Sequence, residues 1–284
     1  MRLAYSFAAA AALVATPISF GAVAFTGSYT QNFDTALTPT NTTQGTTTAY
    51  TDGTTIAGWN FYAEGVTTQA TQFWATDGNT TANQQNLPLS MGSSSAFGAS
   101  AQSDRALGAQ TVNGAGTTRA PIHYAVTLTN NTGHTLTNLS LAYNAELWRV
   151  PSNEGADTDG LAVDYKMGIA PTNGNAAELA GSTTGWTALA AAAYTQTVAH
   201  TGVNQQLDGN VKTTAESASA TIAWLAGTTL TIRWTDAAVN GLSLPLNVVQ
   251  GIDNVAISTP EPAILGVGIV GLLALRRRSG SLSR

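Results

Sequence analysis

The sequence predicts an all-β protein, a single β-sandwich of the jelly-roll type, and three observations support this prediction. Only 10% of the 284 residues are charged, and 28 residues are glycine. The polar residues are mainly Thr, Asn, Ser and Gly, which favour strands and turns over solvated helices. Apolar and polar residues alternate in several segments, whereas the 3.6-residue period of an amphipathic helix is scarce.

The clearest alternation predicts three strands, at residues 122–128, 139–147 and 230–234. Between the first two lies Asn130 to Gly133, whose Asn and Gly residues suit the left-handed conformations of a hairpin turn. The same pattern predicts five shorter strands, at 29–33, 56–62, 161–169, 220–225 and 255–258. Residues 35–55, 76–86 and 152–160 are predicted to be polar surface loops.

The first 24 residues have the pattern of a secretory signal peptide. Arg2 supplies a positive charge, an Ala-rich apolar stretch follows, and Ala22-Val-Ala24 stands before Phe25. We therefore expect an N-terminal signal helix, export through the secretion translocon and cleavage between Ala24 and Phe25. The domain that remains would span residues 25–258, ahead of a C-terminal tail at 259–284.

Charge and cysteine content exclude several classes of function. The chain has no Cys, so it has neither a disulfide framework nor a thiolate metal site. Residues 25–259 contain six basic and 15 acidic residues, a formal charge of −9. Because a protein that binds a phosphate backbone needs a basic surface, we do not expect nucleic acid as a partner.

The C-terminal tail predicts a short membrane helix. The thirteen apolar residues 263–275 would span roughly 20 Å as a helix, against a hydrocarbon core of about 30 Å. Arg276, Arg277 and Arg278 follow, and such charges stay on the cytoplasmic side, which leaves the body of the protein outside. Residues 266–271 match the letters G-x-G-x-x-G, but the flanking strand and acid of a dinucleotide site are missing, so no nucleotide is expected.

The order of Pro260-Glu261-Pro262, an apolar run and an arginine cluster resembles the PEP-CTERM sorting signal of Gram-negative bacteria. The resemblance implies that an exosortase recognises Pro260, Glu261 and Pro262. It also implies transient anchoring in the inner membrane, delivery to the cell surface or extracellular matrix, and a host that makes extracellular polysaccharide. Segments at 103–108, 131–149, 234–236 and 251–253 resemble a β-rich module of secreted PEP-CTERM proteins. The alternative is a plain C-terminal anchor with a chance Pro-Glu-Pro.

Glu146 and Trp148 are candidates for ligand contact. On a regular strand they share one face. An exposed indole can cover the apolar face of a sugar ring while a neighbouring carboxylate accepts hydrogen bonds from its hydroxyl groups. The alternative is structural, with the indole covered by the second sheet and Glu146 paired to Arg105, Arg119 or Arg233.

No cofactor is expected, with one exception. Asp157, Asp159, Asp236 and Asp253 lie in and around loops, and oxygen-rich loops can hold a structural Ca²⁺. No EF-hand loop is present, so spacing alone does not decide between a calcium site and solvated carboxylates.

These observations favour an exported, non-catalytic protein with a structural or adhesive role, one that binds polysaccharide. The alternative is a carbohydrate-active hydrolase of the jelly-roll type, which would need two carboxyl groups at a fixed separation. The sequence contains no G-x-S-x-G motif, and His123, His134 and His200 do not form a metal-binding pattern.

Overall fold

The computed structural model describes residues 21–37, 47–64, 69–78, 88–91, 103–110, 121–150, 160–169, 176–179, 185–198, 205–236 and 248–259. The predicted signal helix and the tail, with Pro260, Glu261, Pro262 and Arg276, Arg277 and Arg278, lie outside these residues. The same is true of Asp157 and Asp159. Within the described segments, none of the helices is long and apolar enough to span a membrane.

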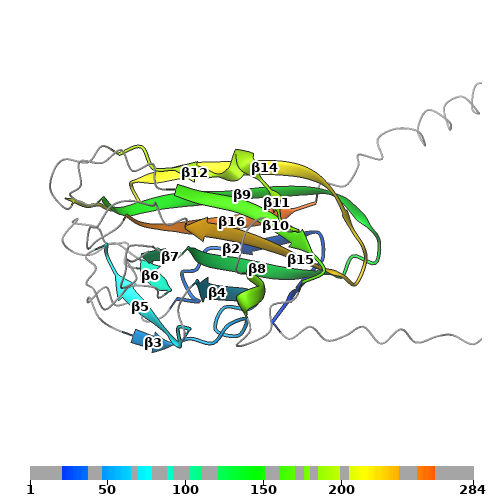
Figure 1. Cartoon of the computed structure of the whole chain (residues 1–284), viewed down its shortest axis with the longest axis horizontal. Coiled ribbons are helices and arrows are strands. Elements are labelled where there is room, and N and C mark those ends of the chain that lie inside the picture. Colours follow the sequence, from blue (N-terminus) through cyan, green and yellow to red (C-terminus); the bar gives the residue numbers. More distant parts are fainter. Residues whose placement is uncertain are drawn as a thin grey trace, which may run out of the picture.

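Two β-sheets make up the described structure, which confirms the all-β prediction (Figure 1). The strand order of the first, here sheet A, is β1-β8-β15-β10-β11, with β4 paired to β8 and β12 to β10. Its strands are β1 (Val23–Phe25), β4 (Trp59–Ala63), β8 (Ile122–Asn130), β10 (Gly160–Met167), β11 (Thr187–Ala188), β12 (Tyr194–Thr195) and β15 (Thr229–Asp236).

The strand order of the second sheet, sheet B, is β13-β9-β16-β7-β6-β5-β3, with β14 paired to β9 and β2 to β16. Two short 3₁₀ helices, η3 (Ala176–Leu179) and η4 (Ala190–Ala192), accompany the sheets. The strands of sheet B are β2 (Ser28–Gln31), β3 (Thr47–Ala49), β5 (Gln72–Thr76), β6 (Leu89–Met91), β7 (Ala106–Gln110), β9 (Leu136–Val150), β13 (Gln205–Gln206), β14 (Thr213–Trp224) and β16 (Val249–Ser258).

The main core lies between the two sheets and is rich in aromatic residues. Trp59 of β4 and Trp234 of β15 stack with ring centroids 5.5 Å apart, and Tyr143 of β9 meets Trp234 edge-on at 5.7 Å. The indole N–H of Trp59 donates to the hydroxyl of Tyr29 on β2, at 2.7 Å. These contacts join sheet A to sheet B, so the two sheets form a sandwich around one continuous apolar layer.

Each of the eight predicted strands corresponds to a strand of the structure, with shifted ends. The three clearest predicted strands correspond to β8, β9 and β15, and the five shorter ones correspond to β2, β4, β10, β14 and β16. Strand β3 lies inside the stretch 35–55 that was predicted to be a loop, so that prediction was wrong at 47–49. Its three residues, Thr-Thr-Ala, lack the apolar alternation on which the prediction depended.

The hairpin predicted at Asn130 to Gly133 is also wrong. Strand β8 belongs to sheet A and β9 to sheet B, so the turn carries the chain from one sheet to the other. The Asn130 side chain fixes this crossing: its Oδ1 accepts from the Thr132 N–H at 3.0 Å, and its Nδ2 donates to the carbonyl oxygens of His134 and Trp224, each at 2.9 Å. Turn residues and periodicity reveal a reversal of the chain but not which strands then pair.

A smaller apolar cluster lies on the outer face of sheet B. It is centred on Trp148 and contains Leu89, Met91, Ala106 and Val249. Gly108 of β7 and Gly251 of β16 are directly paired beneath it, and neither has room for a Cβ atom because Met91 lies across both. The two glycines therefore let the Met91 side chain of the neighbouring strand β6 lie directly on this part of sheet B.

We expect Gly108→Ala to destabilise the protein by about 3 kcal/mol, since overpacking of this kind forces the backbone to move. An added Cβ would lie 2.3 Å from the carbonyl oxygen of Gln250 and 2.9 Å from the Cα of Gly251. Urea unfolding followed by tryptophan fluorescence measures this loss. Gly133→Ala is the control: its φ of +81° costs about 1–2 kcal/mol, but no atom lies within 4 Å. Equal losses in both variants would contradict the close approach of β7 and β16.

Candidate functional site

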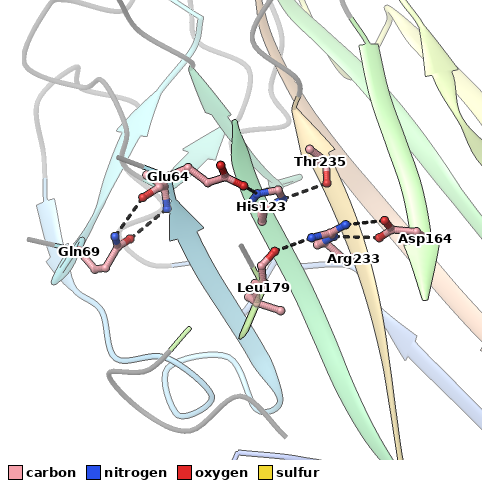
Figure 2. A network of polar contacts seen from close by, with 8 residues as sticks. Glu64, Gln69, His123, Asp164, Leu179, Arg233 and Thr235 are labelled. Carbon is pink, nitrogen blue, oxygen red and sulfur yellow. Dashed lines mark hydrogen bonds and ion pairs between the residues drawn. The ribbon is translucent and has the colours of Figure 1, made fainter. Parts of the chain in front are cut away.

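Each sheet has a group of buried polar residues on its outer face, and the two groups differ in how well their charges are paired. On sheet A, His123 of β8 joins three strands (Figure 2). Its Nε2 lies 2.7 Å from Oε1 of Glu64, and its Nδ1 lies 2.9 Å from Oγ1 of Thr235. Burial lowers the pKa of His123. The ring is therefore neutral at pH 7, donating from Nε2 to the carboxylate and accepting from the threonine hydroxyl.

Arg233, on β15, extends this network towards the segment that covers the sheet (Figure 2). Its Nε and terminal nitrogen donate to the two carboxylate oxygens of Asp164 at 2.9 and 2.5 Å, a bidentate pair, and a second terminal nitrogen donates to the carbonyl of Leu179. The guanidinium carbon lies 3.9 Å from the ring centroid of Trp186. Arg233 thus holds η3 and Trp186 against the sheet.

The order carboxylate, imidazole, hydroxyl in Glu64, His123 and Thr235 resembles that of a hydrolytic triad. Its surroundings favour a structural role, however. Thr235 lies within a strand paired on both sides, to His123 of β8 and Ala162 of β10, so the nearby N–H groups serve the sheet rather than an oxyanion. His123 is only 2% exposed. We interpret this network as structural: it holds the segment that contains η3 and Trp186 against sheet A.

On sheet B, the predicted ligand pair Glu146 and Trp148 is buried, so the prediction of an exposed sugar-binding platform was wrong. Trp148 is 0% exposed and Glu146 is 3% exposed, and the indole N–H donates to Oε2 of Glu146 at 3.0 Å. The cover is not the opposite sheet. It is the segment around Gly209, which lies so close to the indole that a Cβ there would be 2.1 Å from the ring.

Further acids surround Glu146. The register pairs Gly251 with Glu146 and Asp253 with Asn144, which places Glu146 and Asp253 on the same face of adjacent strands. Burial, reinforced by the charges of Asp253 and Asp104, raises the pKa of Glu146 to about 8. Burial and the charges of Asp104 and Asp34 raise the pKa of Asp253 to about 7. Both groups are therefore largely or partly protonated at neutral pH.

Arg105, fully buried just before β7, supplies a positive charge next to Asp34 and Asp77. Burial lowers its pKa to about 10, and the charges of Asp34 and Asp77 oppose that shift, so the guanidinium stays charged at neutral pH. The backbone N–H of Arg105 donates to Oδ1 of Asp34 at 2.9 Å. Sequence reasoning missed Asp34 and Asp104, because nothing in their local pattern indicates that the fold brings them to Asp253.

The β2–β16 ladder ends where these acids meet. Phe33 and Asn254 have φ angles of 58° and 50°, the left-handed region, and are the non-glycine residues with positive φ in the described segments. The register of β16 against β9 also shifts between Asp253 and Ala256, which is the mark of a β-bulge. Both strands turn sharply at this point. Asp34 follows Phe33 in the sequence, and Asp253 precedes Asn254.

A cavity of about 390 Å³ opens beside this point, between β2 and β16; we call it the ladder-end pocket. Asn32 and Asn254, both exposed, flank the two acids. The Asn32 amide donates to Asp34 at 2.8 Å and the Asn254 amide donates to Asp253 at 2.6 Å. The lining residues are Thr30, Gln31, Asn32, Asn254, Val255 and Ala256.

The remaining predicted residues are placed as follows. Asp236 is fully buried at the end of β15 in sheet A and accepts from the amide of Gln250 at 3.2 Å, whereas Asp253 lies in sheet B. Asp236 and Asp253, the two predicted calcium ligands that lie within the described residues, are thus on different sheets. Among the residues that the structure describes, no three acidic or histidine side chains are placed to share one metal ion. At the predicted signal cleavage site, Ala22 is half-buried, Ala24 is exposed and Phe25 is buried in β1.

Neither a protein-family model nor a curated protein matches this sequence. Among solved structures, the chain is similar to the K1 and K3 cleaved adhesin domains of Lys-gingipain from Porphyromonas gingivalis W83, each with a TM-score of 0.37. Identities are 11% and 12%, over 82% and 81% of this chain and 98% of each adhesin domain. It is also similar to TmCBM27, a carbohydrate-binding module with specific mannan recognition, with a TM-score of 0.29 and 13% identity over 76% of this chain and 96% of the module. These similarities are too distant to transfer a function.

The raised pKa values of Glu146 and Asp253 predict that the stability of the fold decreases as the pH rises. The folded protein holds the protons of Glu146 and Asp253 more tightly than the unfolded chain, whose values are near 4.5 and 3.8. Their contribution to stability is therefore greatest at low pH and is lost as the pH rises through about 8.

We expect the free energy of unfolding to fall by about 2 kcal/mol between pH 6.5 and 9 in EDTA, where His123 stays neutral. Urea unfolding checks this, and Glu146→Gln should flatten the slope. Stability that rises over this range would contradict the assignment.

Proposed function

We propose that this chain is an exported, non-catalytic β-sandwich of the cell surface or extracellular matrix, which binds a neutral polysaccharide through the ladder-end pocket. The pocket is the observation that carries the proposal. Its volume of about 390 Å³ lies within the range of small-molecule sites. It is lined by hydroxyl and amide groups, which both donate and accept hydrogen bonds, as sugar hydroxyl groups do.

Charge favours a neutral ligand over an acidic one. None of the described side chains that line the ladder-end pocket is charged. The acids around Asp253 lie next to it, and residues 25–259 carry a formal charge of −9. A polyanionic glycan would therefore be repelled at distances up to about the Debye length, roughly 8 Å at physiological salt.

The runner-up is a carbohydrate-active hydrolase, and one observation favours it. Glu146 and Asp253 are neighbouring carboxyl groups with raised pKa values, and glycoside hydrolysis uses a protonated acid beside a second carboxylate. Their burial argues against it, because side chains that are 3% and 2% exposed do not reach a glycosidic bond. We therefore favour binding without turnover.

We expect the purified full chain to bind neutral extracellular polysaccharide in co-sedimentation. Removal of a hydrogen-bonding amide from the pocket, in Asn32→Ala or Asn254→Gly, should weaken binding about tenfold, or 1.4 kcal/mol. Glycine suits position 254 because it keeps the positive φ of 50°. Reducing-end release, measured in the same incubation, should stay at background.

The matched control is Asn138→Ala, which removes an amide from a different cavity of about 340 Å³ between β9 and β14. Binding by the Asn138 variant should equal that of the unmodified protein. An equal loss in all three variants would contradict the pocket assignment. Reducing-end release that disappears in Glu146→Gln would instead establish the hydrolase.

Export and sorting are proposed from the two ends of the sequence. The Ala24–Phe25 bond lies within β1, whose residues pair with β8, and the Phe25 ring packs against Trp224 at 5.0 Å. Cleavage at this bond would therefore precede folding, as it does for a chain threaded through a translocon. At the other end, the Pro-Glu-Pro motif, the apolar run and the arginine cluster support recognition by an exosortase.

In a host with an exosortase, we expect intact-mass spectrometry to find a mature protein without the apolar tail. Glu261→Ala should leave the tail attached, because it alters the recognition motif while the apolar run and arginines stay intact. The same gene in a host that lacks an exosortase is the control and should yield an untrimmed C-terminus. Trimming near Pro260 in that control host would contradict sorting by this route.

A further inference from the structure

We propose that Asp34 and Asp253 hold a divalent cation of the calcium class at the end of the β2–β16 ladder. The site differs from the one predicted from the sequence, which grouped Asp253 with Asp157, Asp159 and Asp236. It also goes beyond glycan binding, because the metal would be bound whether or not a sugar is present.

One carboxylate oxygen of Asp253, Oδ1, indicates where a cation would bind. The side chain is 2% exposed, and its Oδ2 accepts from the Asn254 amide at 2.6 Å. Its Oδ1 is buried and has no hydrogen-bond partner among the described residues. Because a buried carboxylate oxygen without a donor is costly, native proteins rarely leave one unmatched. A cation bound to Oδ1 would remove this cost.

Asp34 supplies the second carboxylate. Phe33 turns the chain at the end of β2, as Asn254 does on β16, and each turn is adjacent to one of the two acids. Asp34 is anchored at Oδ1 by the Arg105 N–H at 2.9 Å and at Oδ2 by the Asn32 amide at 2.8 Å. Each oxygen retains a second lone pair, so both hydrogen bonds are compatible with a metal ligand.

The surrounding groups suit calcium more than zinc or magnesium. Asn32 and Asn254, each hydrogen-bonded to one of the two acids, also line the ladder-end pocket, so their amide groups and solvent in the pocket are the neutral oxygen ligands nearest to the site. Calcium accepts six to eight oxygen ligands, including amides and waters, in flexible geometry, whereas magnesium requires a near-ideal octahedron. The chain has no Cys, and the described residues bring no histidine to the two acids, so the sulfur and imidazole ligands that zinc prefers are not found there.

The local charge balance supports the same conclusion. The charges of Asp104 and Asp34 act on Asp253. The charges of Asp253, Asp104 and Asp208 act on Glu146. Arg105 is the guanidinium beside them, and its charge is shared between Asp34 and Asp77. Among the described residues the acids here outnumber this guanidinium, which leaves a net negative site that attracts a divalent cation.

The test uses the full chain, stripped with EDTA and dialysed, with thermal unfolding followed at pH 7.5. Calcium at a hundredfold excess over its Kd should raise the Tm by about 5 to 10 °C, and isothermal titration calorimetry should show one site per chain. Asp253→Asn should abolish the shift. The same variant should be more stable than the unmodified protein in EDTA, because it removes an unmatched charge, so a failure to fold is not the expected cause of any loss.

Asp34→Asn is the second variant and should also abolish the calcium shift. The matched control is Glu178→Gln, which removes one negative charge from the exposed Glu178 of η3 and should keep the full shift. No calcium shift in the unmodified protein, or a shift retained in both aspartate variants, would overturn the proposal. Because this readout needs no glycan, its result is independent of whether the pocket binds polysaccharide.

Discussion

The stacked indoles of Trp59 and Trp234 are the contact on which both the sandwich and its pocket depend. Tyr143 meets this stack from sheet B at 5.7 Å, and Phe33 packs edge-on against Trp59 at 5.0 Å. Burial of the Phe33 ring is worth about 3 kcal/mol, which exceeds the 1–2 kcal/mol cost of its left-handed backbone. The core therefore holds Phe33 in an unfavourable conformation, and this turn lies between Asn32, which lines the pocket, and Asp34.

The outer faces of the two sheets differ in how their charged groups are paired, and this difference distinguishes a structural network from a candidate binding site. On sheet A, the charges of Arg233 and Asp164 match in a bidentate pair, and His123 has a partner at each ring nitrogen. Such a network is complete and needs no ligand. On sheet B, burial and the charges of neighbouring acids raise the pKa of Glu146 and Asp253, and an oxygen of Asp253 has no donor among the described residues. A ligand or ion adds most stability where the protein has left charge unmatched.

Much of the fold was predictable from the sequence, and little of the site was. Period-two alternation identified β8, β9 and β15 because it reflects burial on one side of a strand, which is a local property. The pairing of strands is not a local property. The turn residues Asn130 to Gly133 therefore predict a hairpin, although in the structure they join two sheets. For Trp148 the sequence allows an exposed indole or one covered by the second sheet, because nothing in its own strand shows that Gly209, sixty-one residues on, would cover it. Asp34 and Asp253 lie 219 residues apart, and only the folded ladder brings their neighbours together.

Hydrogen–deuterium exchange of the full chain, with calcium and with EDTA, tests most directly that the end of the β2–β16 ladder is the functional site. The account predicts slower exchange on calcium addition at residues 30–34 and 253–256, with little change around His123 and Arg233 on sheet A. Protection confined to other segments, or identical exchange in both conditions, would contradict it.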